Sequence, residues 1–259
     1  LKYRPEAVFH AAAHKHVPLM EANPASAIKN NVLGTRNLIY AAEHYGVKRF
    51  VMISTDKAVN PTSVMGTTKR ITELLLEAKA SSSRTKFMAV RFGNVIGSNG
   101  SVVQLFKKQI EQGGPITITH PEIRRFFMTV SEAAQLVLQA GAIGNGGEIF
   151  ILDMGEQIKI IDLAKHLITL SGLELDQDIS IEFTGLRPGE KLYEEVLHDS
   201  ENDAATKHNK IFISHSEKVD FKRLKHNIRT LTHLSKQMNN EEIIKLLKEI
   251  VPNYIPTPN

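Results

Sequence analysis

Hydroxyl, carboxylate and ammonium groups follow one another at Ser54, Thr55, Asp56 and Lys57. Such side chains donate and accept protons, which is the chemistry of acid–base catalysis. They come directly after the apolar run 50–53. A short apolar run of this kind predicts a buried strand of a parallel sheet. Because ligands bind beyond the carboxyl ends of such strands, the sequence predicts a ligand site at residues 54–57.

A second pair of residues follows on the next predicted element. After a loop marked by Asn60 and Pro61, the residues from Met65 onward are typical of a helix. Met65 and Lys69 are four residues apart, so their side chains lie on one helical face, one turn apart. The strand and the helix therefore bring two groups of residues toward one site.

This order of motifs resembles the extended short-chain dehydrogenase/reductase family, in which a Ser or Thr follows a strand and a Tyr-x-x-x-Lys pair follows on a helix. Here Met65 stands at the position of the family's Tyr, and Lys69 at that of its Lys. The residues 54–57 further resemble the nucleotide-sugar 4,6-dehydratases. The combination is most similar to the large, membrane-associated UDP-N-acetylglucosamine 4,6-dehydratases of bacterial polysaccharide and capsule synthesis.

The resemblance implies a role for each catalytic candidate. Thr55 would hydrogen-bond the C4 oxygen of the sugar. Asp56 would protonate the departing C6 hydroxyl, which needs a raised pKa, and Lys57 would remove the C5 proton, which needs a lowered one. Lys69 would anchor the nicotinamide ribose. Because the Met65 thioether carries no proton, the role of the Tyr passes to Asp56, Thr55 or a water; the alternative is an inactive enzyme.

The resemblance also implies an NAD+ or NADP+ cofactor, without deciding between them. The strand expected at residues 4–10 leads into three alanines, whose small side chains let the backbone approach a planar ligand. For Asn31, a role in placing Lys69 and a water is weighed equally against that of a buried, hydrogen-bonded core residue. The residues expected at the cofactor are Ala11, Ala12, Ala13, Asn31, Ser54, Lys69 and Phe92.

Two further segments resemble the substrate side of nucleotide-sugar enzymes, namely RFGNV at 91–95 and LRPGEKLYEE at 186–195. In the second, a Pro-Gly turn would direct Arg187 toward a diphosphate, which its planar guanidinium suits. The alternative is a surface salt bridge from Arg187 to Glu190 or Glu194. The residues expected at the UDP-sugar are Lys15, His16, Asn94, Val102, Arg125, Arg187 and Glu190. No metal site is expected at the His14–His16 segment, because no further ligand pattern accompanies it.

Composition limits the other classes of function. The 259 residues carry a formal net charge of +4 and no basic block interleaved with aromatic residues, which argues against nucleic-acid binding. There is no cysteine, which fits a reducing cytoplasm. No apolar run reaches the ~20 residues that span a bilayer. We expect a cytoplasmic homo-oligomer, with a parent chain that is anchored at the cytoplasmic face of the inner membrane in the family it resembles.

The predicted fold is α/β, a Rossmann-like parallel sheet that lacks its first strands, with a smaller nucleotide-sugar-binding α/β subdomain. Residues 1–178 would be the remainder of the dinucleotide-binding domain, with a substrate-domain insert at about 94–125. Residues 179–259 would form a C-terminal substrate-binding region and tail. The family's glycine-rich cofactor turn is not found before residue 4, so this polypeptide alone is expected to bind cofactor poorly. The main predicted strands are 86–92, 116–119, 148–154, 179–183 and 210–213, and the main predicted helices begin at 23 and 101 or span 132–142, 157–170 and 240–251.

Two other functions remain open from the sequence. A nucleotide-sugar 4-epimerase would share the fold and the segment around Arg187, but has no need of an acid and a base beside C5 and C6. A non-catalytic UDP-sugar-binding remnant is the other alternative.

Overall fold

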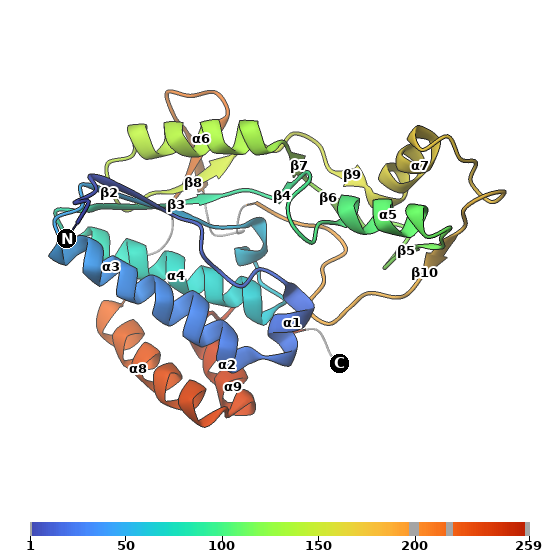
Figure 1. The fold of residues 1–259 in the computed structure, drawn as a ribbon. Coiled ribbons are helices and arrows are strands. Elements are labelled where there is room, and N and C mark those ends of the chain that lie inside the picture. Colours follow the sequence, from blue (N-terminus) through green and yellow to red (C-terminus); the bar gives the residue numbers. More distant parts are fainter. Residues whose placement is uncertain (1, 197–201, 216–219, 257–259) are drawn as a thin grey trace.

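The computed structural model describes residues 2–196, 202–215 and 220–256, and its centre is a six-stranded sheet (Figure 1). Its strands have the order β1-β2-β3-β8-β12-β11, and the first four are parallel. β2 and β3 are buried along nearly their whole length because helices cover both faces, which explains their continuous apolar sequences. The strands are β1 (Ala7–His10), β2 (Arg49–Ile53), β3 (Lys86–Arg91), β8 (Ile149–Leu152), β12 (Ile211–His215) and β11 (Asn202–Ala205).

Helices cover the sheet in two layers (Figure 1). α6 (Val130–Ile143) lies on one face, and α3 (Thr35–His44) and α4 (Val64–Ala80) lie on the other. The chain reaches α3 through α1 (Val17–Ala22), α2 (Pro24–Ala27) and the π-helical η1 (Ile28–Gly34). This arrangement is the predicted Rossmann-like α/β fold.

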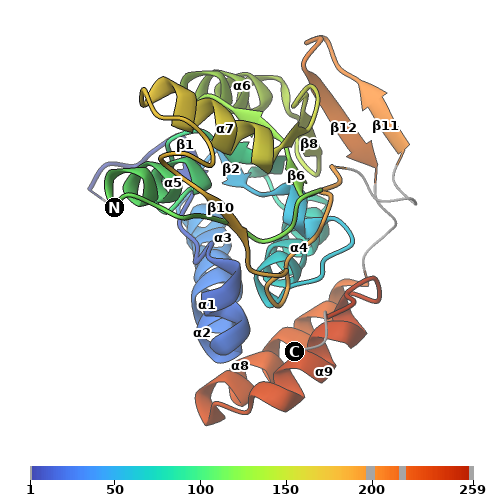
Figure 2. The ribbon, with the colours of Figure 1, turned by 90° about the vertical axis from the view of Figure 1, so that its right-hand side faces the viewer.

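A helical hairpin near the end of the chain covers the second layer from outside. α8 (Phe221–Gln237) and α9 (Asn240–Ile250) pack against α2, η1 and α4, and Figure 2 shows them on the side opposite α6. Their buried residues Leu224, Leu231 and Leu247 join the same core as Phe50 of β2. The backbone N–H of Ile255 then donates to the carbonyl of Pro61, 3.0 Å away, in the loop before α4. The segment that follows the hairpin therefore supports the loop that leads into α4.

A smaller lobe extends from one end of the sheet (Figure 1). Its centre is the parallel pair β5 (Ile116–Ile118) and β10 (Ile181–Phe183), packed with α5 (Val102–Glu111) and α7 (Ile160–Leu170). Short pairs join it to the sheet, namely β4 (Asn94–Val95) with β7 (Phe127–Met128), and β6 (Arg124–Arg125) with β9 (Ile158–Lys159). The lobe thus takes its core from both sides of the predicted boundary at residue 178.

Several elements differ from their predicted bounds. The helix expected at 132–142 begins at Val130, and Thr129, not Ser131, caps it by accepting from the Glu132 N–H. The helix expected at 157–170 begins only at Ile160, because the two residues before it pair as β9. α8 and β11 were not predicted.

Two kinds of feature are not found within the described ranges, namely a membrane-spanning helix and a metal-binding cluster. No helix there combines the length and apolar character needed to cross a bilayer. No group of three His, Asp or Glu side chains in those ranges is arranged to hold a metal ion.

Candidate active site

The end of β2 leads into η2 (Asp56–Ala58), a single 3-10 turn that carries the predicted acid and base. Thr55 caps this turn, since its Oγ1 accepts from the Lys57 N–H. The Asp56 carboxylate is fully buried, and its Oδ1 accepts from Thr55 Oγ1 at 2.9 Å and from Lys57 Nζ at 3.1 Å. The turn therefore holds the three groups in mutual contact.

A glycine on the next helix fixes the position of this turn. Gly66 lies in the first turn of α4, where the Ser63 side chain caps the helix by accepting from the Gly66 N–H. A Cβ at this position would come within 2.1 Å of the Lys57 carbonyl oxygen. The absence of a side chain at Gly66 is what allows α4 to begin directly against η2.

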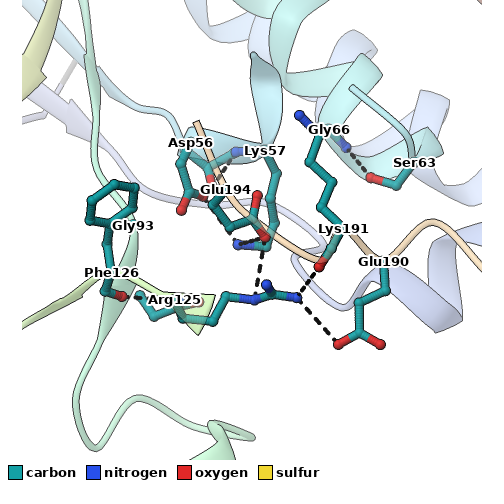
Figure 3. Close-up of polar contacts among 12 residues, drawn as sticks. Asp56, Lys57, Ser63, Gly66, Gly93, Arg125, Phe126, Glu190, Lys191 and Glu194 are labelled. Carbon is teal, nitrogen blue, oxygen red and sulfur yellow. Dashed lines mark hydrogen bonds and ion pairs between the residues drawn. The ribbon is translucent and has the colours of Figure 1, made fainter. Parts of the chain in front are cut away.

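Glu194 of the LRPGEKLYEE segment brings a second carboxylate to the pair (Figure 3). Its Oε1 lies 3.1 Å from Lys57 Nζ and 3.5 Å from Arg125 Nε, and its side chain is almost completely buried. Lys57 therefore bridges two carboxylates that lie far apart in the sequence. The sequence pointed to Glu194 only as a partner for Arg187, and its pairing with Lys57 was missed.

These groups shift each other's proton affinities. Burial raises the pKa of Asp56, and the Glu194 charge adds to this, while Lys57 and Thr55 oppose it. Burial works against the charge of Glu194, but Lys57 and Arg125 outweigh it and hold its pKa below the usual value. Burial likewise works against the Lys57 ammonium, yet Asp56 and Glu194 outweigh it and raise its pKa. The expectation for Asp56 agrees in direction, whereas the prediction of a lowered pKa for Lys57 is wrong in this structure.

A pocket of about 510 Å³, which includes open solvent at its mouth, lies above the pair. Lys57, Arg125, Arg187 and Lys191 line it together with Glu194, so the wall carries four cations. Arg187 is exposed, and within the described ranges its side chain forms no ion pair with Glu190 or Glu194. Arg187 and Lys57 thus face one pocket, as expected, and the Arg187 guanidinium remains available for an anion.

Lys69 extends from α4 to the end of β2. Its Nζ donates to the Ile53 carbonyl oxygen at 2.6 Å, and the residue is 6 % exposed. Burial lowers the pKa of Lys69 to about 8, with Glu73 one turn along opposing the shift. Lys69 therefore lies on the same strand end as Asp56 and Lys57, inside the protein.

Asn31 connects the segment after β1 to the helix that carries Lys69. Its Oδ1 accepts from the His14 N–H at 2.8 Å, and its Nδ2 donates to the His14 carbonyl and to Thr68 Oγ1. All of these contacts are internal, and Thr68 is the neighbour of Lys69. Asn31 is thus a buried, hydrogen-bonded residue whose contacts bear on the placement of Lys69.

Ser54 points into a buried ionic cluster beneath the pair. Its Oγ donates to Glu73 Oε1 at 2.6 Å, and the same carboxylate accepts from Arg91 Nε at 2.9 Å and pairs with Arg91 and Arg70. Burial alone would raise the pKa of Glu73, but the charges of Arg91 and Arg70 lower it to about 2. The Ser54 hydroxyl expected at the cofactor is therefore used inside the protein.

The remaining candidates lie in three settings. Met65 is buried in the apolar core, and Phe92 packs at the edge of a second core. Ala11, Ala12 and Ala13 are exposed beyond β1. Lys15 contacts Ser98, His16 lies against Gly100, Asn94 donates to the Phe126 carbonyl, and Val102 begins α5.

Arg125 and Glu190 form an internal frame for the pocket wall (Figure 3). Arg125 donates to the carbonyls of Lys191 and Leu192, and it also pairs with Glu190 at 3.4 Å. Glu190 in turn accepts from Thr119 Oγ1 and from the Arg187 N–H. These contacts fix the loop that carries Arg187 and Glu194.

Residues 1–216 match the family model described as polysaccharide biosynthesis protein. The chain belongs to this family. CapD of Staphylococcus aureus, a capsular polysaccharide biosynthesis protein, is 56% identical over 95% of the chain and 40% of its own length. The probable polysaccharide biosynthesis protein EpsC of Bacillus subtilis is 61% identical over 77% of the chain and 33% of its own length. The chain thus spans less than half of these curated relatives.

Solved structures and further relatives agree on the fold and on the broad class of enzyme found among the relatives. The X-ray structure of Pen from Bacillus thuringiensis has a TM-score of 0.73 with 40% identity, covering 80% of this chain and 65% of that one. Family members include a UDP-N-acetylglucosamine 4,6-dehydratase (inverting) of Campylobacter jejuni, 39% identical over 75% of this chain and 57% of its own length. They also include a UDP-glucose 4-epimerase of Rickettsia rickettsii, 43% identical over 75% of this chain and 56% of its own length. This is the family of nucleotide-sugar dehydratases and epimerases with the extended short-chain dehydrogenase/reductase fold.

Proposed function

We propose that the protein containing this chain is a UDP-N-acetylglucosamine 4,6-dehydratase that uses NAD+ or NADP+. The observation that carries the proposal is the contact of Asp56 with Lys57 at the end of β2, where Lys57 lines the same pocket as Arg187. An acid and a base in contact suit the loss of water from adjacent carbons, where one proton is removed and another is supplied.

The cofactor fits the residues beside this pair. Lys69 brings a buried ammonium to the end of β2, and the exposed alanines after β1 leave the backbone open to a planar ligand. A UDP-glucose 4-epimerase of Thermus thermophilus solved with NAD has the same fold, with a TM-score of 0.68 and 23% identity over 76% of this chain and 70% of its own. A bound NAD+ or NADP+ would supply reversible hydride transfer, from C4 and back to C6, so that the net reaction is a loss of water.

The chain's own residues perform the elimination. Thr55 hydrogen-bonds the C4 oxygen, and the C4 hydroxyl proton passes to a water as C4 is oxidised. The ketone formed at C4 acidifies the proton on C5. The Lys57 amine takes that proton, and the Asp56 carboxyl gives one to the C6 hydroxyl, which leaves as water. The C5–H and C6–O bonds break, the C5–C6 double bond forms, and the C5 proton remains on Lys57.

The raised pKa of Lys57 is compatible with this role, because the reactive pair differs from the observed ion pair only in the position of one proton. Moving a proton from Lys57 Nζ to Asp56 Oδ1 across their 3.1 Å contact gives an amine and a carboxylic acid without changing the net charge. Exclusion of water by the substrate favours these neutral forms. After the elimination Lys57 is an ammonium and Asp56 a carboxylate, so the observed ion pair is restored. Lys57 then gives a proton to C5 as the hydride returns to C6, and the proton released from the C4 hydroxyl replaces it.

The cationic wall of the pocket supports a diphosphate substrate. A guanidinium binds phosphate oxygens through two parallel hydrogen bonds, and Arg187 has its guanidinium exposed at the pocket. Pro188 and Gly189 fix the turn beside it, and Gly189 packs against Val17 and Ser63 so closely that a Cβ would lie 2.9 Å from either side chain. Arg187 would therefore hold the UDP moiety while the sugar reaches Lys57.

The test uses the full-length protein with UDP-N-acetylglucosamine and the product mass as the measurement. We expect Asp56→Asn and Lys57→Met each to lower the formation of the 4-keto-6-deoxy sugar by roughly 10²-fold or more, the usual contribution of an acid or a base. Asp162→Asn and Lys165→Met, exposed on α7, are the matched controls and should retain wild-type turnover. Undiminished turnover in both active-site variants would contradict the assignment.

A 4-epimerase is the second candidate, because a family member at 43% identity carries that activity. An epimerase oxidises and reduces the same carbon, so its product has the mass of its substrate. A product of unchanged mass from the wild-type protein would favour this candidate, and Asp56 and Lys57 would then require another explanation.

A further inference from the structure

Lys57 lies among buried carboxylates. Within the described ranges, the carboxylates of Asp56, Glu194 and Glu190 pair with Lys57 and Arg125, and Arg187 and Lys191 line the same pocket. Removal of a charge from water is costly unless that charge is paired. The buried carboxylate with the fewest cationic contacts is therefore the one that takes up a proton most easily.

The unpaired oxygens show which carboxylates are least compensated. Within the described ranges, Asp56 Oδ2 and Glu194 Oε2 are buried side-chain atoms that have no hydrogen-bond partner. Asp56 Oδ2 points toward Gly93, where a Cβ would lie 3.0 Å from it. A buried oxygen that has no hydrogen-bond donor costs less free energy on a protonated carboxyl than on a carboxylate. Asp56 and Glu194 therefore compete for one proton.

Glu194 is the better compensated of the two. It contacts both cations, whereas Asp56 contacts only Lys57. Lys191 also favours the Glu194 carboxylate from its own segment, and burial is the main effect on Asp56. The proton that leaves Lys57 is therefore held on Asp56, while Glu194 stays ionised.

We propose that Glu194 is a positioning residue of the reaction: it holds Lys57 Nζ between two carboxylates and supplies the negative charge that keeps a proton on Asp56. The inference rests on the proposed function, in which Asp56 gives that proton to the departing hydroxyl. Glu194 itself is assigned no contact with the reacting atoms.

The small lobe determines where this charge lies. The main-chain carbonyl of Glu194 accepts from Gln157 Nε2 at 2.6 Å, and Arg125 holds the carbonyls of Lys191 and Leu192 just before it. The 186–195 segment must therefore be in place for the Glu194 charge to act on the acid and base of η2. This links the charge of the catalytic pair to the lobe that holds Arg187.

The experiment compares Glu194→Gln, Glu194→Asp and the control Glu182→Gln, all in the full-length protein. Glu182 lies on β10 of the same lobe and is exposed. The first measurement is the pH dependence of kcat. The second is an infrared titration of the Asp56 carboxyl in protein labelled with ¹³C-aspartate, assigned by its loss in Asp56→Asn.

Loss of the Glu194 charge is expected to lower the proton affinity of both Asp56 and Lys57. Both limbs of the pH–rate curve of Glu194→Gln should move to lower pH, kcat should fall by about 10-fold or more, and the Asp56 band should titrate at lower pH. Glu194→Asp should keep the position of the curve at a reduced rate, and Glu182→Gln should match the wild type. Glu194→Met gives a second charge-free variant if the Gln variant does not fold.

A curve and a carboxyl titration that stay at the wild-type pH in the charge-free variants would overturn the inference, even if kcat fell. The infrared titration needs no turnover. A wild-type protein that forms no dehydrated product, but whose Asp56 titration still responds to Glu194, would therefore refute the proposed function and leave the role of Glu194 standing.

Discussion

Lys69 carries a buried ammonium that donates to the main-chain carbonyl of Ile53, and burial lowers its pKa to about 8. Lysine in an unfolded chain has a pKa near 10.4, so the native state binds fewer protons than the unfolded state between these two values. The free energy of unfolding therefore rises with pH across this window. At neutral pH the folded protein bears the full cost of the charge, which is tolerated at a site where an ammonium is needed.

We predict that Lys69→Met stabilises the full-length protein at pH 7 while it impairs turnover. The pKa difference corresponds to roughly 3 kcal/mol, and loss of the hydrogen bond to Ile53 offsets about 1 kcal/mol of it. Urea unfolding should show this advantage at pH 7 and its decline between about pH 8 and 10.5. An advantage that does not change with pH would show that packing, and not the charge of Lys69, is responsible.

Among single residues, the sequence predicted contacts between neighbours along the chain, but not contacts with partners far away in the sequence. Asp56 and Lys57 follow a strand in the sequence, so their meeting at one site could be expected. Glu194 reaches Lys57 only because β10 and the 186–195 segment fold back over η2, which no local pattern encodes. Ser54 was misjudged for the same reason, since its partners Glu73 and Arg91 lie on two other elements.

At the scale of elements, the contact of α4 with η2 depends on Gly66, although its backbone conformation is one that any residue could adopt. Gly66 lies in an ordinary helical turn, and only the closeness of the Lys57 carbonyl excludes a side chain. Gly34, in η1, offers a contrast within the chain, because the nearest atom to a Cβ there is 4.0 Å away.

We predict opposite effects of alanine at these two glycines. Gly66→Ala should lower the free energy of unfolding by about 1–3 kcal/mol, as overpacking does, and should reduce turnover because η2 carries Asp56 and Lys57. Gly34→Ala should raise the free energy of unfolding by about 0.5–1 kcal/mol through helix propensity. Chemical denaturation and product formation measure both effects. An equal response of the two variants would contradict the packing explanation.

Patterns within single elements explain what was predicted at this scale. The apolar runs of β2, β3 and β8 and the periodicity of α7 and α9 are local signals, and each gave an element close to the observed one. The helix α8 was overlooked although its buried residues Leu224, Ile228 and Leu231 have helical spacing. Its strongly polar remaining surface concealed that pattern.

At the scale of the whole molecule, the site lies where three parts of the chain converge. The sheet provides the acid and base, the small lobe provides Glu194 and Arg187, and the C-terminal hairpin supports the loop before α4 through the contact of Ile255 with Pro61. The division of the chain at residue 178 was drawn from sequence order. Parallel pairing of β5 with β10 joins the insert expected at about 94–125 to the region after residue 178, and α7, which precedes that boundary, packs in the same lobe.

The central claim is that Lys57 and Asp56 remove water across C5 and C6 of the sugar. The most direct test is the reaction of the full-length protein with UDP-N-acetylglucosamine in D2O, followed by mass and NMR analysis of the product. We predict a product that has lost one water and carries one deuterium from solvent at C5, with formation nearly abolished in Lys57→Met. A product of unchanged mass without deuterium at C5 would contradict the account.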